Sequence, residues 1–312
     1  MKALGANAAA RVTRFLCKLH GSSQPILAEA SDGRIYVVKF PQINCANFLF
    51  NECLGSNLYM MFGLICPPWK PLILTDDFLD DNPGCWMARE HGFVRPTAGL
   101  CFGSCFMGTS KSRLWEILPS SWLKRIHSPF DFWRAWFLDL NAEHYDTRQA
   151  IFQEEKDHVL HPWFIDHGYM FGGPNDRSCL KTLAPRYLDP RIYGEMPVKR
   201  FTAWVQAVGE LKEDTFLPLL DGIPDDWKTQ SALSAFDRFI RRTLDHNLAR
   251  ILIREMEAAH RAFGQRRLNK EQDWRNAPIG REAIPAIHFS RDKASIGTGC
   301  RVPLVPMALP DQ

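Results

Sequence analysis

Two aspartates that flank strand-like apolar runs are the residues of this chain best placed to do chemistry. Asp146 precedes the run 150–152 and Asp166 follows the run 163–165, twenty positions apart within the segment 139–171. The polar residues 153–161 between the runs predict a hairpin. An acid at the edge of a buried strand can contact a metal ion or a substrate. Kinase-type phosphotransferases need such a pair, because one acid orients the attacking hydroxyl and the other binds the metal.

The histidines of the same region favour a second kind of site, a metallohydrolase centre. Its ligands would be His144, Asp146, His161 and Asp166. The spacing shows neither the HxH nor the HExxH pattern of such centres. A metallohydrolase centre also leaves Lys39 and Glu52 without a role.

Lys39 lies in the second strand of a predicted hairpin. The runs PILAEA (25–30) and RIYVVKF (34–40) flank Ser31-Asp32-Gly33, and Asp-Gly between two such runs is a strong hairpin signal. Because side chains alternate along a strand, Val38 and Phe40 share one face and Lys39 lies on the other. Lys39 is therefore either a strand-edge residue that reaches solvent or a lysine aimed into a phosphate site.

Glu52 lies on a predicted helix, residues 48–62 (FLFNECLGSNLYMMF), which Asn44 or Asn47 can cap and Gly63 ends. Most of the circumference of this helix is apolar, which predicts a buried helix. A buried carboxylate needs a cationic partner, and Lys39 is a candidate. A solvated glutamate on the rim of the helix is the alternative.

The remaining elements follow from composition and periodicity. We expect a lead-in contacting the domain at 1–20, strands at 70–75 and 85–91 that complete a small antiparallel sheet, an acidic loop at 76–84, and a flexible connector at 92–111. Helical segments are expected at 112–118, 131–140, 198–212 and 231–264, and a tail of low order from 275.

Composition excludes several classes of protein. With 312 residues the chain can form two lobes or domains, and its net charge of +3 gives no reason to expect nucleic-acid binding. The nine cysteines include no CxxC pair, which favours free thiols in a reducing, cytoplasmic setting. Asn7, Arg11 and Arg14 interrupt the N-terminal segment, so we expect no signal peptide, and no apolar run is long enough to span a membrane.

The chain resembles the HipA-like kinases of bacteria over residues 18–262, in motifs that follow the family's order. Residues 21–40 (GSSQPILAEASDGRIYVVKF) are similar to a glycine–serine loop and lysine strand, and 51–55 (NECLG) to a glutamate-bearing helix. Residues 146–152 (DTRQAIF) are similar to the catalytic segment, 164–171 (FIDHGYMF) to the metal strand, and CFGS (101–104) and IPDDW (223–227) extend the similarity.

The resemblance implies an α+β, bilobal, protein-kinase-like fold. It comprises a small antiparallel-sheet N-lobe at 1–91, a mostly helical C-lobe at 92–274 and the low-order tail at 275–312. It also implies ATP and Mg²⁺ as cofactors and a protein substrate.

The resemblance implies a role for each candidate residue. Lys39 would hold the α- and β-phosphates, Glu52 would orient Lys39, Asp146 would be the catalytic base and Asp166 would bind Mg²⁺. Two segments would contact the nucleotide: a loop over the phosphates and a hinge strand, residues 85–90, that meets adenine with backbone groups. Their residues are Gly21, Ser22 and Ser23 in the loop, and Arg89 and Glu90 at the end of the hinge strand.

The chain departs from the family at the second metal ligand. The expected Asn, five residues after the base, is Ile151, and His144 replaces an Asn two residues before the base. Gln149 is the candidate substitute, although an amide binds magnesium more weakly than a carboxylate. Two functions stay open: an ATP-dependent phosphotransferase acting on a Ser/Thr hydroxyl of a protein, itself included, and a nucleotide-binding pseudokinase with a regulatory or interaction role.

Overall fold

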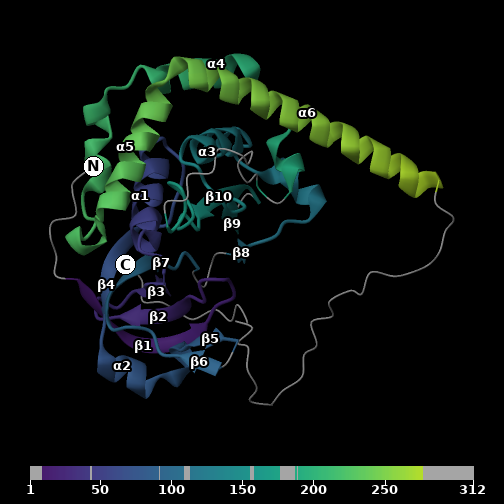
Figure 1. The fold of residues 1–312 in the computed structure, drawn as a ribbon. Helices are drawn as coiled ribbons and strands as arrows, with labels where there is room; N and C mark the ends of the chain where they lie inside the picture. Colours follow the sequence, from purple (N-terminus) through teal and green to yellow (C-terminus); the bar gives the residue numbers. More distant parts are fainter. Residues whose placement is uncertain are drawn as a thin grey trace.

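The computed structural model describes residues 9–42, 44–90, 92–108, 113–154, 158–175, 187 and 189–276. Within them the chain is a mixed helix and sheet protein with two hydrophobic cores. The smaller core fills a β-barrel, and the larger one lies among the helices and a second sheet. Figure 1 shows the barrel strands in the lower part of the view, with α2 (Asp76–Asp81) below them and α1 (Phe48–Met61) above them.

The barrel has five strands in the order β1-β2-β3-β7-β4. The predicted hairpin is confirmed, because β2 and β3 pair antiparallel. The lead-in at 1–20 contains β1, whose Ala10 and Val12 are buried, and β1 closes the barrel by pairing parallel with β4. The prediction of an antiparallel sheet is therefore wrong for the β1–β4 pair. The barrel strands are β1 (Ala10–Lys18), β2 (Ile26–Ala30), β3 (Ile35–Lys39), β4 (Trp69–Leu74) and β7 (Gly99–Cys105).

The prediction of a flexible connector at 92–111 is wrong for β7, which pairs with both β3 and β4. Glycine at position 103 permits this pairing, because the Cβ of any other residue would lie 2.4 Å from the Leu72 side chain and clash with it. The strand expected at 85–91 forms β5 (Met87–Arg89), which pairs with β6 (Gly92–Val94) in a separate two-stranded sheet. The predicted boundary at 91–92 lies between these two strands, and the chain returns to the barrel in β7 after them.

The acidic segment expected to be a loop forms a short helix, α2 (Asp76–Asp81), followed by a 3-10 turn, η1 (Pro83–Cys85). Thr75 caps α2 by accepting a hydrogen bond from the Phe78 N–H. The loop prediction is therefore wrong for residues 76–81. Asp76 and Asp77 in the first turn interact favourably with the helix dipole, so an acidic composition is compatible with a helix here.

The predicted buried helix is α1 (Phe48–Met61), and its apolar residues lie in the larger core. Asn47 precedes it, but the Asn47 side chain makes no capping hydrogen bond. Its Oδ1 atom instead accepts hydrogen bonds from the hydroxyls of Thr229 and Ser231, at the start of α5 (Gln230–Leu244). The predicted cap therefore ties α1 to a distant helix.

A second sheet of three strands carries the two aspartates at its edge. The predicted hairpin is confirmed by the antiparallel pairing of β9 (Gln149–Glu154) with β10 (Leu160–Ile165). The third strand is β8 (Arg113–Trp115), so the helix predicted at 112–118 is wrong for these residues.

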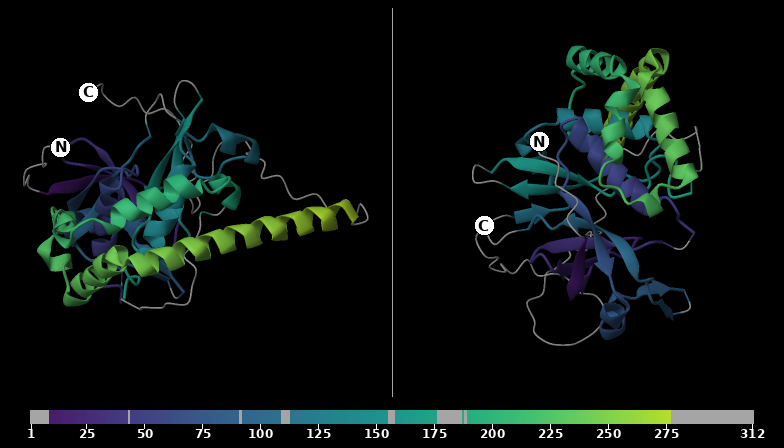
Figure 2. Two further views of the ribbon diagram at one scale, coloured as in Figure 1. Left: turned by 90° about the horizontal axis from the view of Figure 1, so that it is seen from above. Right: turned by 90° about the vertical axis from the view of Figure 1, so that its left-hand side faces the viewer.

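The remaining helices surround the larger core, and α6 extends well beyond it (Figure 2). The periodic stretch 231–264 divides at Asp245 into two helices. Most of the predicted tail, residues 277–312, lies outside the described residues. The helices are α3 (Phe130–Asn141), α4 (Val198–Gly209), α5 (Gln230–Leu244) and α6 (His246–Asn276); the 3-10 turns are η2 (Ser120–Arg125), η3 (Pro190–Tyr193), η4 (Glu213–Thr215), η5 (Leu217–Leu220) and η6 (Asp225–Trp227).

Two further expectations concern thiols and membranes. The cysteines that the structure describes are free, and most of them are buried. Within the described part of the chain, we find no helix with the length and hydropathy that a membrane span requires.

Candidate active site

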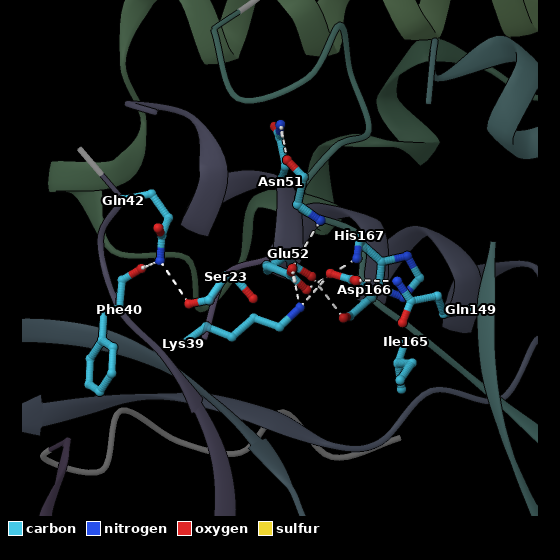
Figure 3. A network of polar contacts seen from close by, with 12 residues as sticks. Ser23, Lys39, Phe40, Gln42, Asn51, Glu52, Gln149, Ile165, Asp166 and His167 are labelled. Carbon is cyan, nitrogen blue, oxygen red and sulfur yellow. Dashed lines mark hydrogen bonds and ion pairs between the residues drawn. The ribbon is translucent and has the colours of Figure 1, made fainter. Parts of the chain in front are cut away.

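Lys39 joins two carboxylates that come from different parts of the chain. Its Nζ atom lies 2.5 Å from Glu52 Oε1 on α1 and 2.7 Å from Asp166 Oδ1, directly after β10 (Figure 3). Lys39 is 8% exposed and Glu52 is 1% exposed. Lys39 is therefore not a strand-edge residue, and Glu52 is not a solvated glutamate on the rim of its helix.

The charges of this cluster do not balance, because one ammonium group faces two carboxylates. Burial alone would lower the pKa of Lys39, but Asp166 and Glu52 outweigh it and the net pKa is raised. Burial works against ionised Asp166, yet the Lys39 ammonium lowers its pKa to about 2. Burial raises the pKa of Glu52, and Lys39 offsets this only in part. With both acids ionised the cluster carries one net negative charge, which favours a further cation.

Asp166 begins a tight turn that α1 holds in place. Its φ of 64° is in the left-handed region, which is uncommon for residues other than glycine. Glu52 accepts hydrogen bonds from the next two backbone N–H groups, His167 at 3.2 Å and Gly168 at 3.0 Å. A Cβ at Gly168 would lie 2.2 Å from the Phe48 ring and 2.8 Å from Glu52 Oε1, so only glycine fits here. The carboxylate that pairs with Lys39 therefore also shapes the turn that carries Asp166.

Gln149 completes the polar surroundings of Asp166. Its Nε2 atom donates to Asp166 Oδ2 at 2.6 Å, so both carboxylate oxygens of Asp166 have a side-chain donor. Ile151, at the position expected for a second metal ligand, lies on β9 opposite Trp163. Gln149, the substitute ligand that the sequence indicated, therefore lies in contact with Asp166, the predicted metal-binding residue.

Asp146 lies in the loop between α3 and β9 and is half-buried. Its Oδ1 atom accepts the Thr147 N–H at 2.7 Å, and among the described residues no hydrogen bond or ion pair joins it to the Lys39 cluster. Backbone hydrogen bonds from Tyr145 N–H to Tyr169 O and from Phe171 N–H to Ala142 O hold this loop beside the turn after Asp166. The two aspartates therefore lie on adjacent, hydrogen-bonded loops.

Arg148, two residues after Asp146, pairs with Asp139. Arg148 donates through Nε and Nη2 to the two oxygens of Asp139, and both residues are almost fully buried. Arg148 also donates to Ile165 O at 2.9 Å, and Tyr59 donates to Asp139 Oδ1 at 2.8 Å. Burial would raise the pKa of Asp139, but the Arg148 guanidinium more than offsets this, and the pKa lies well below its usual value. Arg148 therefore joins the end of α3 to the strand that leads to Asp166.

Sequence reasoning missed this buried pair. Both residues lie in or at the edge of the segment first singled out, but Asp139 is on α3 and Arg148 is just before β9. The one signal available was an arginine two residues before the apolar run 150–152, which must find an acid if it is buried.

The glycine–serine loop lies between β1 and β2 and is attached to the β5–β6 ribbon. The Gln24 side chain donates to Ala88 O at 2.8 Å and accepts from Ala88 N–H at 2.7 Å. Gln42 Nε2 donates to Ser23 O at 3.1 Å (Figure 3). Gly21 has a φ of 133°, which favours glycine, and the Ser22 hydroxyl interacts with the phenol of Tyr169.

Arg89 and Glu90, the other predicted nucleotide contacts, are exposed residues at the end of β5. Among the described residues, neither makes a hydrogen bond or ion pair with Lys39, Glu52 or Asp166. The strand within residues 85–90, β5, pairs with β6 and is not one of the five barrel strands.

The metallohydrolase alternative receives no geometric support. The His161 ring packs on His127 with ring centroids 4.6 Å apart, and His144 contacts Arg148 in the buried network. In the described parts of the chain, no group of three or more His, Cys, Asp or Glu side chains is arranged to hold a metal ion.

We expect the Lys39–Asp166 pair to make the protein sensitive to acid. A carboxyl whose pKa is about 2 when folded and about 3.9 when unfolded stabilises the fold above about pH 4, and this contribution is lost as the pH falls toward 2. Between pH 7 and pH 3, the wild-type protein should lose about 1 kcal/mol more free energy of unfolding than Asp166→Asn. Urea unfolding at both pH values measures this, and equal losses in the two proteins would contradict it.

Comparisons with known proteins give structural similarity at low sequence identity. The chain is similar to the Golgi casein kinase, with 11% identity, a TM-score of 0.46, and coverage of 78% of this chain and 73% of that one. It is similar to hydra Fam20 with sugar, with 12% identity, a TM-score of 0.43, and coverage of 79% and 87%. It is also similar to the Helicobacter pylori proinflammatory kinase CtkA, with 14% identity, a TM-score of 0.32, and coverage of 78% and 85%.

No protein-family model matches the chain, and no curated protein matches it in sequence. Because the TM-scores lie below 0.5, the function proposed below rests on the contacts of the site itself.

Proposed function

We propose that the chain is an ATP-dependent phosphotransferase of the HipA-like type, which transfers the γ-phosphate of ATP to a Ser or Thr hydroxyl of a protein. The β-barrel would form the N-lobe of a bilobal kinase-like protein, and the helices with the second sheet would form the C-lobe. The observation that carries this proposal is the contact of one buried lysine with both Glu52 and Asp166.

Phosphoryl transfer depends mainly on positioning and charge neutralisation, and the cluster offers both. Glu52 holds the buried Lys39 side chain in one position, from which the Lys39 ammonium group would bind phosphate oxygens. Asp166 and Gln149 are oxygen-bearing residues that would hold Mg²⁺, once the Gln149 amide turns its oxygen toward the ion. Magnesium needs only one or two protein carboxylates when the phosphates supply further ligands, and the net negative charge of the cluster suits a cation. When bound, Mg²⁺ would neutralise charge on the phosphates.

Asp146 would orient the acceptor hydroxyl and take its proton. It is half-buried and lies on the loop that is hydrogen-bonded to the turn after Asp166. No other described side chain holds its carboxylate, which accepts only the Thr147 N–H. Within the described part of the chain, its second oxygen is therefore available to a substrate hydroxyl.

The glycine–serine loop would cover the phosphates with Gly21, Ser22 and Ser23. Arg89 and Glu90 remain proposed contacts to the nucleotide, at the ribbon to which Gln24 attaches this loop.

A second candidate function is a nucleotide-binding pseudokinase with a regulatory or interaction role. Ile151 favours it, because an aliphatic side chain at the position of the second metal ligand cannot bind Mg²⁺. Asp146 and the contact of Gln149 with Asp166 favour the active enzyme instead.

Nucleotide binding should stabilise the protein under both candidate functions. A ligand present at 100 times its Kd raises the free energy of unfolding by about 2.7 kcal/mol. We therefore expect ATP with Mg²⁺ to raise the Tm of the wild-type protein and to raise it much less in Lys39→Ala. A thermal-shift titration measures this. No shift at millimolar nucleotide would contradict both functions, and equal shifts would remove Lys39 as a phosphate ligand.

Incubation with labelled ATP, with and without a cell lysate, separates the two functions. An active kinase labels a lysate protein or itself, and mass spectrometry then identifies the phosphorylated hydroxyl. A protein that binds ATP with Mg²⁺ but produces no label under either condition is the pseudokinase.

A further inference from the structure

We infer that Asn51 is a positioning residue that fixes the metal-binding acid Asp166 by holding the following loop, residues 168–173, against α1. Asn51 lies on α1 directly before Glu52 and is 1% exposed. Its Nδ2 atom donates to three backbone carbonyl oxygens of this loop, those of Gly168 at 3.1 Å, Met170 at 2.8 Å and Gly173 at 3.1 Å. Figure 3 shows Asn51 beside the Lys39 cluster.

The orientation of the Asn51 amide follows from its surroundings. Carbonyl oxygens accept hydrogen bonds and cannot donate them, so an atom that faces three of them must be the nitrogen. Two N–H bonds shared among three acceptors include a three-centre hydrogen bond. The side chain is therefore committed to this loop.

Asn51 and Glu52 bind the two backbone groups of the same residue, Gly168. Glu52 accepts the N–H of Gly168, and Asn51 donates to the C=O of Gly168. Successive helix residues point about 100° apart, which lets the two side chains reach different sides of the loop. A side chain at Gly55, one turn further along α1, would lie 2.4 Å from His167 Cβ, so the helix and the loop are in close contact there as well.

These contacts act on Asp166 because it is the residue where the turn begins. Its left-handed backbone conformation is held only if the segment after it is held. Residues that orient a metal ligand without contacting the metal change the metal affinity by about 10- to 100-fold when they are replaced. Asn51 would thus set the metal affinity of the site without touching the metal, and its acting through a metal rests on the proposed function.

The test compares Asn51→Asp with Asn57→Asp on the same helix. Asn51→Asp keeps the shape of the side chain but turns a carboxylate toward three carbonyl oxygens. Asn57 donates to a single carbonyl, that of Leu219 at 2.8 Å, and accepts from Trp69, so its substitution removes one helix contact remote from Asp166. Asn51→Ser, whose hydroxyl can still donate to one carbonyl, serves if Asn51→Asp does not fold.

Two measurements separate the inference from the proposed function. The first is hydrogen–deuterium exchange over residues 167–173 in the absence of ligands, which we expect to quicken at least tenfold in the Asn51 variants and not in Asn57→Asp. The second is Mn²⁺ binding, followed by electron paramagnetic resonance with a non-hydrolysable ATP analogue. We expect its Kd to rise about tenfold or more in the Asn51 variants relative to Asn57→Asp.

Unchanged exchange in the Asn51 variants, or Mn²⁺ affinities within twofold of Asn57→Asp, would overturn the inference. Failure of the wild-type protein to bind Mn²⁺ with the nucleotide would overturn the proposed function, and with it the positioning of a metal ligand by Asn51. Faster exchange in that same experiment would still establish that Asn51 holds the loop.

Discussion

Replacing Asp146 with Asn is expected to reduce phosphate transfer by about 100- to 10,000-fold, the usual contribution of a general base. The amide keeps an oxygen that can accept the Thr147 N–H, so the local turn should persist. It cannot take a proton from the acceptor hydroxyl. Because Asp146 makes no contact with the Lys39 cluster in the described residues, nucleotide binding should change little. The measurement is the rate of labelling from ATP, with Kd for the nucleotide determined in parallel.

The matched control for this prediction is Asp226→Asn, an exposed aspartate in η6. It should transfer phosphate at the wild-type rate. Transfer by Asp146→Asn at the rate of this control would show that Asp146 is not the base. Loss of both transfer and nucleotide binding in Asp146→Asn would show that it acts on the fold of the site instead.

Replacing Arg148 with Met is expected to destabilise the protein by about 3–5 kcal/mol, because it leaves the buried Asp139 carboxylate without its cationic partner. The Tyr59 hydroxyl still donates to Asp139 but cannot supply a positive charge. His144 Nδ1 lies 3.3 Å from Asp139 Oδ1, and burial lowers the pKa of His144, which disfavours its charged form. The change also removes the donor to Ile165 O, so the strand that leads to Asp166 loses one of its attachments. Urea unfolding monitored by circular dichroism measures the effect.

Arg95→Met is the control for Arg148→Met. Arg95 pairs with Asp76 and Asp80, whose side chains are 71% and 62% exposed. Surface ion pairs contribute at most about 1 kcal/mol, so this variant should remain close to wild type. Adding Asp139→Asn to Arg148→Met should restore part of the lost stability, since the unpaired charge is then gone. An Arg148→Met protein as stable as Arg95→Met would show that the buried pair does not support the fold.

The sequence predicted those parts of the site that lie on regular elements. A strand has two faces and a helix has a buried side, so local periodicity left two positions open for each of Lys39 and Glu52. Their contact, one of these alternatives, is confirmed. The β9–β10 hairpin was likewise visible as two apolar runs around a polar segment. The assignment of Asp146 as a base stays a prediction, because the structure places it beside the site without a contact that shows its chemistry.

Local sequence failed where partners distant in the chain decide the structure. The glycines of β7 favour a loop, but Gly103 is required by the close approach of Leu72 on β4. Residues 113–115 resemble a helix, but hydrogen bonding to β9 makes them a strand. In each case the energy of pairing with a distant strand exceeds a local preference of a few tenths of a kcal/mol.

By itself, then, the sequence determined that Lys39 lies on a strand and Glu52 on a helix, and that a lysine and two acids from separate segments could share a site. Only the tertiary structure decided how that site is held. Asp139 meets Arg148, and Asn51 meets the carbonyls of a loop more than a hundred residues away, through contacts that no periodicity encodes. Burial is the physical reason: a polar group removed from water must find a partner, and only the folded chain determines which one is within reach.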